Sequence, residues 1–186
     1  KPLYGSNLLV NGSAELPLAS YGWVMSRGDW FRRLGDQHEG SYSFTPGSYS
    51  NDRATIYQDV DVSEFSDDIE NGSQSFEFSG YIKRLKGFAS VTVSFIDAAG
   101  TLTEALKSHD QTKANEYVNV SSTLNPPAGT VKIRILLHTH KEGRGSGSSF
   151  TRYDAFSLIA NEPTQRPFGN EGDPWPIAGR IQAENF

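Results

Sequence analysis

The chain has 186 residues, a formal net charge of −5, 36% hydrophobic residues and no cysteine. Its length allows one hydrophobic core and a short additional segment. The lack of cysteine excludes thiol catalysis, Cys-ligated zinc and disulfides. The fold would therefore have to be stabilised by packing or by a hard metal bound through oxygen. The negative charge argues against a nucleic-acid partner, and no apolar stretch is long enough to cross a bilayer, which argues against a membrane partner.

The first distinctive stretch, NLLVNGSAE, runs from Asn7 to Glu15 and joins an apolar run, an Asn-Gly pair and one carboxylate. Glu15 can be a solvated hairpin carboxylate, a catalytic acid or a metal ligand, and the stretch alone leaves these alternatives open. Further along, Trp23 is expected in the core. In GDWFRRLGDQHEG one of Trp30 and Phe31 should face the core and the other the solvent.

Period-two alternation dominates the middle of the chain. The stretches QSFEFSGYIKRL, ASVTVSFIDAAG and TVKIRILLHTH each place apolar side chains on one side and mainly polar ones on the other. Glycine, serine, asparagine and aspartate interrupt these runs at short intervals. The pattern predicts an all-β, antiparallel β-sandwich of the jelly-roll type, and only residues 101–107 could form a helical turn or two.

The pattern changes after Ala160. The stretch NEPTQRPFGNEGDPWP is rich in proline, glycine and polar residues and shows no period, so it is typical of a linker. IAGRIQAENF then looks like the opening of another strand. We expect a β-sandwich over residues 1–160, a linker over 161–176 and the start of a following, truncated module over 177–186.

Three stretches together resemble the jelly-roll carbohydrate-binding modules of the family 4, 9, 16 and 22 type. They are NLLVNGSAE, EYVNVSSTLNPPAGTVKIRI with Tyr117 in the aromatic position, and RYDAFSLI with its acidic residue at Asp154. The tail GRIQAENF resembles the first strand of a family 6 carbohydrate-binding module. The resemblance implies a secreted, extracellular, multimodular enzyme with covalently linked catalytic and binding modules, of which this chain is a monomeric part.

The resemblance also implies a structural calcium ion. In modules of this type a carboxylate from the first strand and one from the last, with backbone carbonyls, hold the ion, which accepts six to eight oxygen ligands in flexible geometry. Carried over, the side-chain ligands are Glu15 and Asp154, and the carbonyls lie near Ser13 and Ser41. The plain alternative is that Glu15 is a solvated hairpin carboxylate and that Asp154 caps a turn.

A sugar site needs flat aromatic faces and fixed polar groups. We expect it on the concave polar face and its rim, with candidate ligand-binding residues Trp30, Tyr57, Tyr81, Arg134, His138 and His140. Tyr57 is near the position where family 22 modules carry a binding tryptophan, which is a departure from that pattern. Basic residues on the alternating runs favour an acidic or sulfated algal or plant cell-wall glycan, namely an agar or porphyran type of galactan, or alginate, over xylan or glucan.

Polysaccharide binding without catalysis is the preferred function, as an ancillary module of an agarase or a similar enzyme. A small jelly-roll glycoside hydrolase or polysaccharide lyase is the first alternative, but the polar faces are poor in the paired carboxylates that a glycosidase needs. An adhesin or spacer domain that binds protein is the second alternative. No nucleophile-elbow motif, zinc-binding helix or phosphate loop is present in the sequence.

Overall fold

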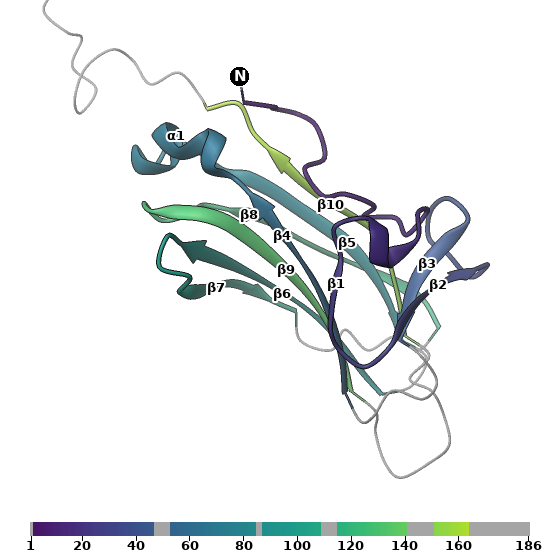
Figure 1. Ribbon diagram of the computed structural model, residues 1–186. Coiled ribbons are helices and arrows are strands. Elements are labelled where there is room, and N and C mark those ends of the chain that lie inside the picture. Colours follow the sequence, from purple (N-terminus) through teal and green to yellow (C-terminus); the bar gives the residue numbers. More distant parts are fainter. Residues whose placement is uncertain (1, 47–52, 85–86, 109–114, 141–150, 164–186) are drawn as a thin grey trace, which may run out of the picture.

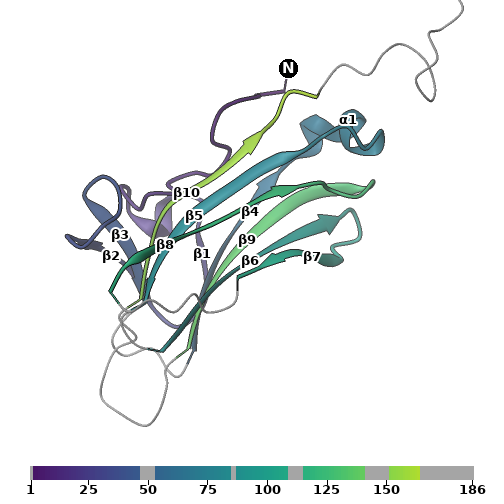
Figure 2. The same cartoon turned by 180° about the vertical axis from the view of Figure 1, so that it is seen from behind.

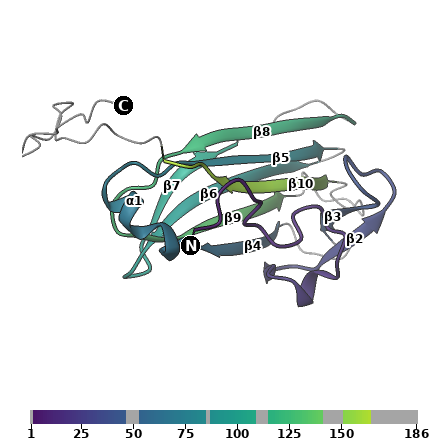
Figure 3. The same cartoon turned by 90° about the horizontal axis from the view of Figure 1, so that it is seen from above.

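The computed structural model describes residues 2–46, 53–84, 87–108, 115–140 and 151–163. Within these ranges, ten strands form two five-stranded antiparallel sheets, which lie as two layers (Figures 1 and 3). The predicted all-β jelly roll is therefore confirmed. Within the described ranges no helix is long and apolar enough to cross a membrane.

The first sheet has the order β1-β4-β9-β6-β7 and the second has the order β2-β3-β10-β5-β8. The strands of the first are β1 (Val24–Arg27), β4 (Arg53–Asp61), β9 (Thr130–His140), β6 (Phe88–Asp97) and β7 (Leu102–Lys107). Those of the second are β2 (Trp30–Leu34), β3 (Tyr42–Pro46), β10 (Thr151–Ala160), β5 (Phe76–Arg84) and β8 (Tyr117–Leu124). In the described part of the chain, helical structure is limited to α1 (Ser66–Glu70) and the 3-10 turns Leu18–Ser20 and Ser63–Phe65.

Residues 101–107 do not form the helical turn that the sequence allowed. They contain β7, an edge strand that pairs with β6. The pairing has a register irregularity between Val93 and Ser94 of β6. All of β7 except Leu106 is exposed, so its sequence shows neither the alternation of a half-buried strand nor the apolar stripe of a helix. Pairing to β6 decides the structure here, which the local pattern could not reveal.

The core lies between the two sheets and consists of their inward-facing aliphatic and aromatic residues. Phe44, Phe76 and Ile133 are fully buried, and Trp23 is 4% exposed, as predicted for it. Trp23 packs against Phe44 with 5.0 Å between ring centroids, and its indole N–H donates to the carbonyl of Val10. The stripes that alternate in sequence are thus the two inner faces of the sandwich.

The N-terminal segment runs beside β10 (Figure 1). A register shift between Asp154 and Ser157 interrupts the pairing of β10 with β5, and Ala155 has a positive φ of 51° at this bulge. The amide N–H of Phe156 donates to the Gly12 carbonyl at 3.0 Å, and the Asn7 side chain donates to the Phe156 carbonyl at 3.1 Å. The opening motif therefore satisfies the backbone groups of the bulge.

Strand β10 ends at Ala160, next to the predicted boundary. Residues 164–176 of the predicted linker and all of the predicted module start at 177–186 lie outside the described residues. Both assignments remain predictions.

Candidate functional site

We call the solvent-facing side of the first sheet the β4–β9 face; its central residues are Tyr57, Asp59, Arg134, Leu136, His138 and His140. The register explains how they meet, because Tyr57 pairs with Leu136 and Asp59 with Arg134, while Ile56 and Ile135 point into the core. Side chains on one face of a sheet recur every second residue. The structure thus brings together four of the predicted ligand-binding residues: Tyr57, Arg134, His138 and His140.

Arg134 is held in place from two sides. Its Nε and Nη2 donate to the two carboxylate oxygens of Asp59 at 2.6 and 2.7 Å, which is a bidentate ion pair. Its guanidinium carbon lies 4.0 Å from the centroid of the Tyr57 ring. The hydrogen bonds with Asp59 raise the pKa of Arg134 above its usual value, so the group is a permanent cation. The three side chains form a fixed aromatic, cationic and anionic unit on the sheet.

His138 and His140 continue the same face toward one end of β9. The His138 carbonyl accepts a hydrogen bond of 2.7 Å from the buried Tyr153 hydroxyl, which fixes the backbone there. Burial is the main cause that lowers the pKa of His138, and Coulombic interactions with Arg53 and His140 add to it. The His140 ring packs against Phe88 with 5.8 Å between centroids, and its buried Nδ1 has no hydrogen-bond partner.

Tyr81 does not share this face. It lies on β5 in the second sheet (Figure 2), paired with Asp154 and Asn119, and it is on the side of that strand opposite to the buried Phe78 and Ile82. The His38 ring stacks on Tyr81 with 3.5 Å between centroids, so this tyrosine ring is covered by a loop. Placing Tyr81 with Arg134 was wrong, because alternation assigns a residue to a polar face but does not say to which sheet that face belongs.

Trp30 is not at the rim of a site. It is 3% exposed and packs against Tyr153 with 5.7 Å between ring centroids, so it belongs to the core, whereas Phe31 is 54% exposed. The sequence predicted that one of these neighbours faces inward, and the structure shows that it is Trp30. Its assignment as a ligand-binding residue is therefore wrong.

The two predicted calcium ligands meet at one loop. Glu15 Oε1 accepts the amide N–H groups of Ser41 at 2.7 Å and of Tyr42 at 2.9 Å. Asp154 Oδ2 accepts the amide N–H groups of His38 at 2.7 Å and of Glu39 at 3.0 Å. Carboxylates from the two ends of the domain thus converge on residues 38–42.

These residues offer calcium the oxygen ligands that it prefers, but a bound ion would have to share them with four amide hydrogens. Burial raises the pKa of Asp154, and its hydrogen bonds from Glu39, His38 and Ala155 oppose that rise. Ser13 precedes Glu15 in the N-terminal turn, and the Ser41 carbonyl accepts the Gly35 amide at 3.2 Å. Among the described residues no group of three acidic or histidine side chains could hold a metal.

Sequence reasoning missed Asp59, Arg27, Arg53 and Lys107. Asp59 follows Tyr57 by two residues in TIYQDVD, so the period of β4 could have placed it on the same face. Arg27 and Lys107 lie on the short edge strands β1 and β7, whose residues carry no clear alternation. Only their pairing with β4 and β6 brings them to this face.

No protein-family profile and no curated protein matches the chain. Solved structures do match it. A family 61 carbohydrate-binding module in complex with β-1,4-galactotriose has a TM-score of 0.58 at 16% identity, over 83% of this chain and 99% of that one. A family 16 carbohydrate-binding module has a TM-score of 0.59 at 16% identity, over 82% of this chain and 99% of that one. The chain has the fold of a jelly-roll carbohydrate-binding module.

The same fold also occurs inside a larger protein. The enzymatically active domain of tailspike protein 4 from bacteriophage CBA120 has a TM-score of 0.59 at 16% identity, over 83% of this chain. This chain spans only 21% of that tailspike chain. At this identity the likeness to the carbohydrate-binding-module fold and to the tailspike concerns architecture, and the function must be argued from the side chains.

Proposed function

We propose that this chain is a non-catalytic polysaccharide-binding module and that its ligand lies on the β4–β9 face. The observation that carries the proposal is the unit of Tyr57, Arg134 and Asp59 on the outer face of a fold shared with sugar-binding modules. An ion pair that also contacts an aromatic ring costs side-chain entropy to hold in place. On a partly exposed sheet face such an arrangement is more useful for binding than for stability.

The chemistry of this unit suits a sugar ring. An aromatic side chain offers an apolar surface to the C–H groups of a pyranose, and fixed polar groups select its hydroxyls. Two of the five N–H donors of Arg134 are used by Asp59, and the guanidinium edge can donate further to sugar oxygens. Because the side chains are already ordered, binding costs less side-chain entropy.

The length of the face suits a chain segment. Arg134 and His138 lie four residues apart on β9, about 13 Å along the strand, which matches two or three sugar units. Leu136 lies between them and adds apolar surface. The face therefore favours an internal segment of a polysaccharide over a single terminal sugar.

Asp59 and Glu104, two carboxylates in one row of the β4–β9 face, are too far apart for glycosidase chemistry. Asp59, Arg134, Ser94 and Glu104 follow one another across four adjacent strands, so the two carboxylates lie three strand spacings, about 14 Å, apart. Inverting and retaining glycosidases hold their carboxyl groups within about 10 Å and 5.5 Å of each other. Asp59 is also engaged by Arg134. This supports binding without catalysis.

We further propose an extracellular setting, in which the chain is a monomeric module of a secreted multimodular carbohydrate-active enzyme. The support is the Pro/Gly-rich stretch after Ala160 and the strand-like sequence that follows it. The ligand that we propose is an algal or plant cell-wall glycan, of the agar or porphyran type or alginate. A structural calcium held by Glu15 and Asp154, with carbonyls near Ser13 and Ser41, is part of the same proposal, and the convergence of both carboxylates on one loop supports it.

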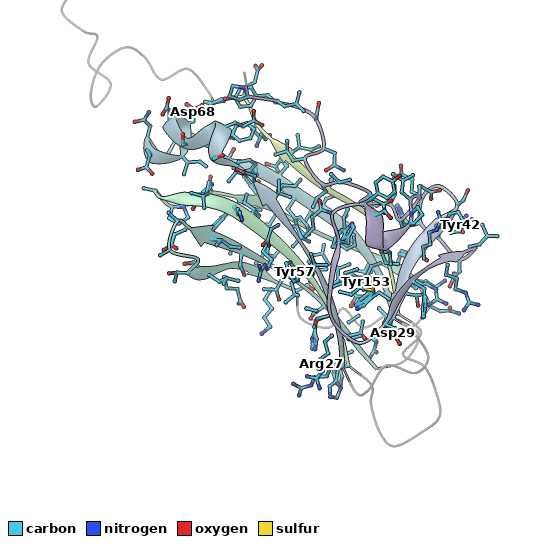
Figure 4. The ribbon with its side chains drawn as sticks, in the orientation of Figure 1. Arg27, Asp29, Tyr42, Tyr57, Asp68 and Tyr153 are labelled. Atoms are coloured by element: carbon cyan, nitrogen blue, oxygen red, sulfur yellow. The ribbon has the colours of Figure 1, made fainter. Side chains whose placement is uncertain are left out.

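The proposal is tested by binding of the full chain to a panel of insoluble and soluble polysaccharides, with reducing ends and unsaturated products measured in parallel. Binding without product release supports it, and released product would overturn it. Tyr57→Ala should lose most of the binding. Tyr42→Ala is the matched control, because Tyr42 also lies under a guanidinium, that of Arg32 at 4.3 Å, but belongs to the other sheet (Figure 4).

If the parent binds no polysaccharide, the module is not a carbohydrate binder and the adhesin alternative gains support. If Tyr42→Ala loses as much affinity as Tyr57→Ala while both remain folded, the β4–β9 face is not the site.

A further inference from the structure

One end of the β4–β9 face gathers positive and titratable side chains from four strands. Arg53 on β4 pairs with His140 on β9, which pairs in turn with Phe88 on β6. In the next row Thr55 lies between Arg27 and His138. Lys107 on β7 pairs with Thr92, which pairs with Leu136. We call this set the basic end; its members are Arg27, Arg53, Lys107, His138 and His140.

The acidic residues of the same face lie toward the other end. Asp59 is neutralised by Arg134, Glu104 pairs with Ser94 in that row, and Asp61 lies opposite Lys132 one row further. Within the described part of the chain, the charged neighbours of His138 are Arg53 on β4, Arg27 on β1, Lys107 on β7 and His140 on β9, all basic or titratable to a cation. The face of an acidic protein is therefore polarised along its strands.

Two observations indicate that the basic end is incomplete without a ligand. The Nδ1 atom of His140 is buried and has no hydrogen-bond partner, while Phe88 beside it is 43% exposed. Burial and the surrounding cations lower the pKa of His138, so like charges are concentrated here at a cost to the free protein. A bound anion would relieve that repulsion. A hydrogen bond between the ligand and Nδ1 of His140 would give that buried atom a partner. Figure 4 shows Arg27 at the lower end of this sheet, away from Tyr57.

We propose that the basic end binds an anionic substituent of the glycan, a sulfate ester or a uronate carboxylate, while Tyr57 and Arg134 hold another sugar of the same chain. This inference rests on the proposed function. Arg53 and Tyr57 lie four residues apart on β4, about 13 Å, so the anionic group belongs to a sugar two or three units from the one at Tyr57. A regularly substituted polysaccharide meets that condition.

The test uses matched polysaccharide pairs that differ only in charge, titrated into the full chain at low salt. Sulfated κ-carrageenan and its desulfated form make the sulfate arm, and polygalacturonate and its methyl ester make the carboxylate arm. We expect the anionic member of at least one pair to bind five-fold or more tighter. That preference should shrink as sodium chloride is raised, because exposed charges are screened.

The variants Arg53→Gln and Lys107→Gln should each reduce the preference for the anionic member several-fold. Lys132→Gln is the matched control, since Lys132 is an exposed cation on the same face but at the opposite end of β9. The preference should also grow between pH 7.5 and pH 5.5, because an anion favours the protonated form of His138, and His138→Gln should abolish that growth.

The outcomes separate the two proposals. If the chain binds no polysaccharide of the panel, or if Tyr57→Ala binds like the parent, the proposed function fails. If another polysaccharide binds but neither member of any pair does, the anionic subsite is overturned. If the parent binds but both members bind equally, or if Lys132→Gln lowers the preference as much as Arg53→Gln does, the anionic subsite is overturned while the binding face stands.

Discussion

Arg134 and Asp59 face each other across β9 and β4 and share two hydrogen bonds of 2.6 and 2.7 Å. Their side chains are about a quarter exposed, at 26% and 25%. A pair with this exposure contributes little to stability, typically about 0–1 kcal/mol. Its effect is geometric, because the planar guanidinium is oriented over the Tyr57 ring by the carboxylate beside it.

Arg134→Lys should therefore separate geometry from charge. Lysine keeps the positive charge but cannot form the bidentate pair with Asp59 or lie flat over Tyr57. We expect polysaccharide affinity to fall five-fold or more, which corresponds to about 1 kcal/mol. The melting temperature should change little, which differential scanning calorimetry checks. Unchanged affinity in a folded Arg134→Lys variant would show that charge alone matters at this position.

The sequence was sufficient to predict the fold class and the residues that share one face of a strand. It was insufficient to predict which strand faces come together in one sheet. The alternation around Arg134 and His138 was correct because β9 is central and each of its sides meets a different environment. Tyr81 shows the same alternation but belongs to the other sheet, because sheet membership depends on pairing between distant segments. Trp30 was misplaced because two adjacent aromatic residues give no period to decide which one faces inward.

The opening motif was recognised as a resemblance, and its physical role is now visible. Asn7 Oδ1 accepts the amide groups of Leu9 at 3.0 Å and Leu158 at 2.9 Å, so one side chain joins the first segment to the last strand. We expect Asn7→Ala to lower the free energy of unfolding by about 1–3 kcal/mol, because backbone groups lose their partners. Asn125→Ala, at an exposed position, is the control in urea titration. Equal stability of both variants would mean that water replaces the lost contacts.

Gly80 marks a second close approach at the same bulge. A Cβ added to Gly80 would overlap the Phe156 ring, which is 2% exposed in the core. Gly80→Ala should therefore destabilise the domain by about 1–3 kcal/mol through overpacking. Ser121→Ala on the neighbouring β8 changes an exposed side chain and should be nearly neutral. Thermal unfolding of the two variants checks the difference, and a neutral Gly80→Ala would mean that Phe156 can move aside freely.

The proposed calcium site leads to a separate prediction for Glu15. If the ion is bound between Glu15 and Asp154, a chelator should lower the melting temperature of the parent, since a ligand that binds only the native state stabilises it. Glu15→Gln should melt at a lower temperature than the parent and should no longer respond to the chelator. Isothermal titration of calcium into the metal-free chain measures the binding directly. A parent whose melting temperature does not respond to the chelator would show that the Glu15 carboxylate is held by the amide groups of Ser41 and Tyr42 without an ion.

The pH dependence of stability should carry the signature of His138. Burial lowers its pKa in the folded chain below the ordinary value of about 6.5, so the unfolded chain binds the proton more readily. Stability should therefore be lost as the pH falls below about 6.5, until the folded imidazole is also protonated.

Comparing melting temperatures at pH 7.5 and 5.5 should show a smaller drop for His138→Gln than for the parent. Asp154 has a raised pKa and acts in the opposite direction, over a range that begins at its ordinary value of about 3.9 and extends upward. A drop that is the same in both proteins would assign the pH response to other groups.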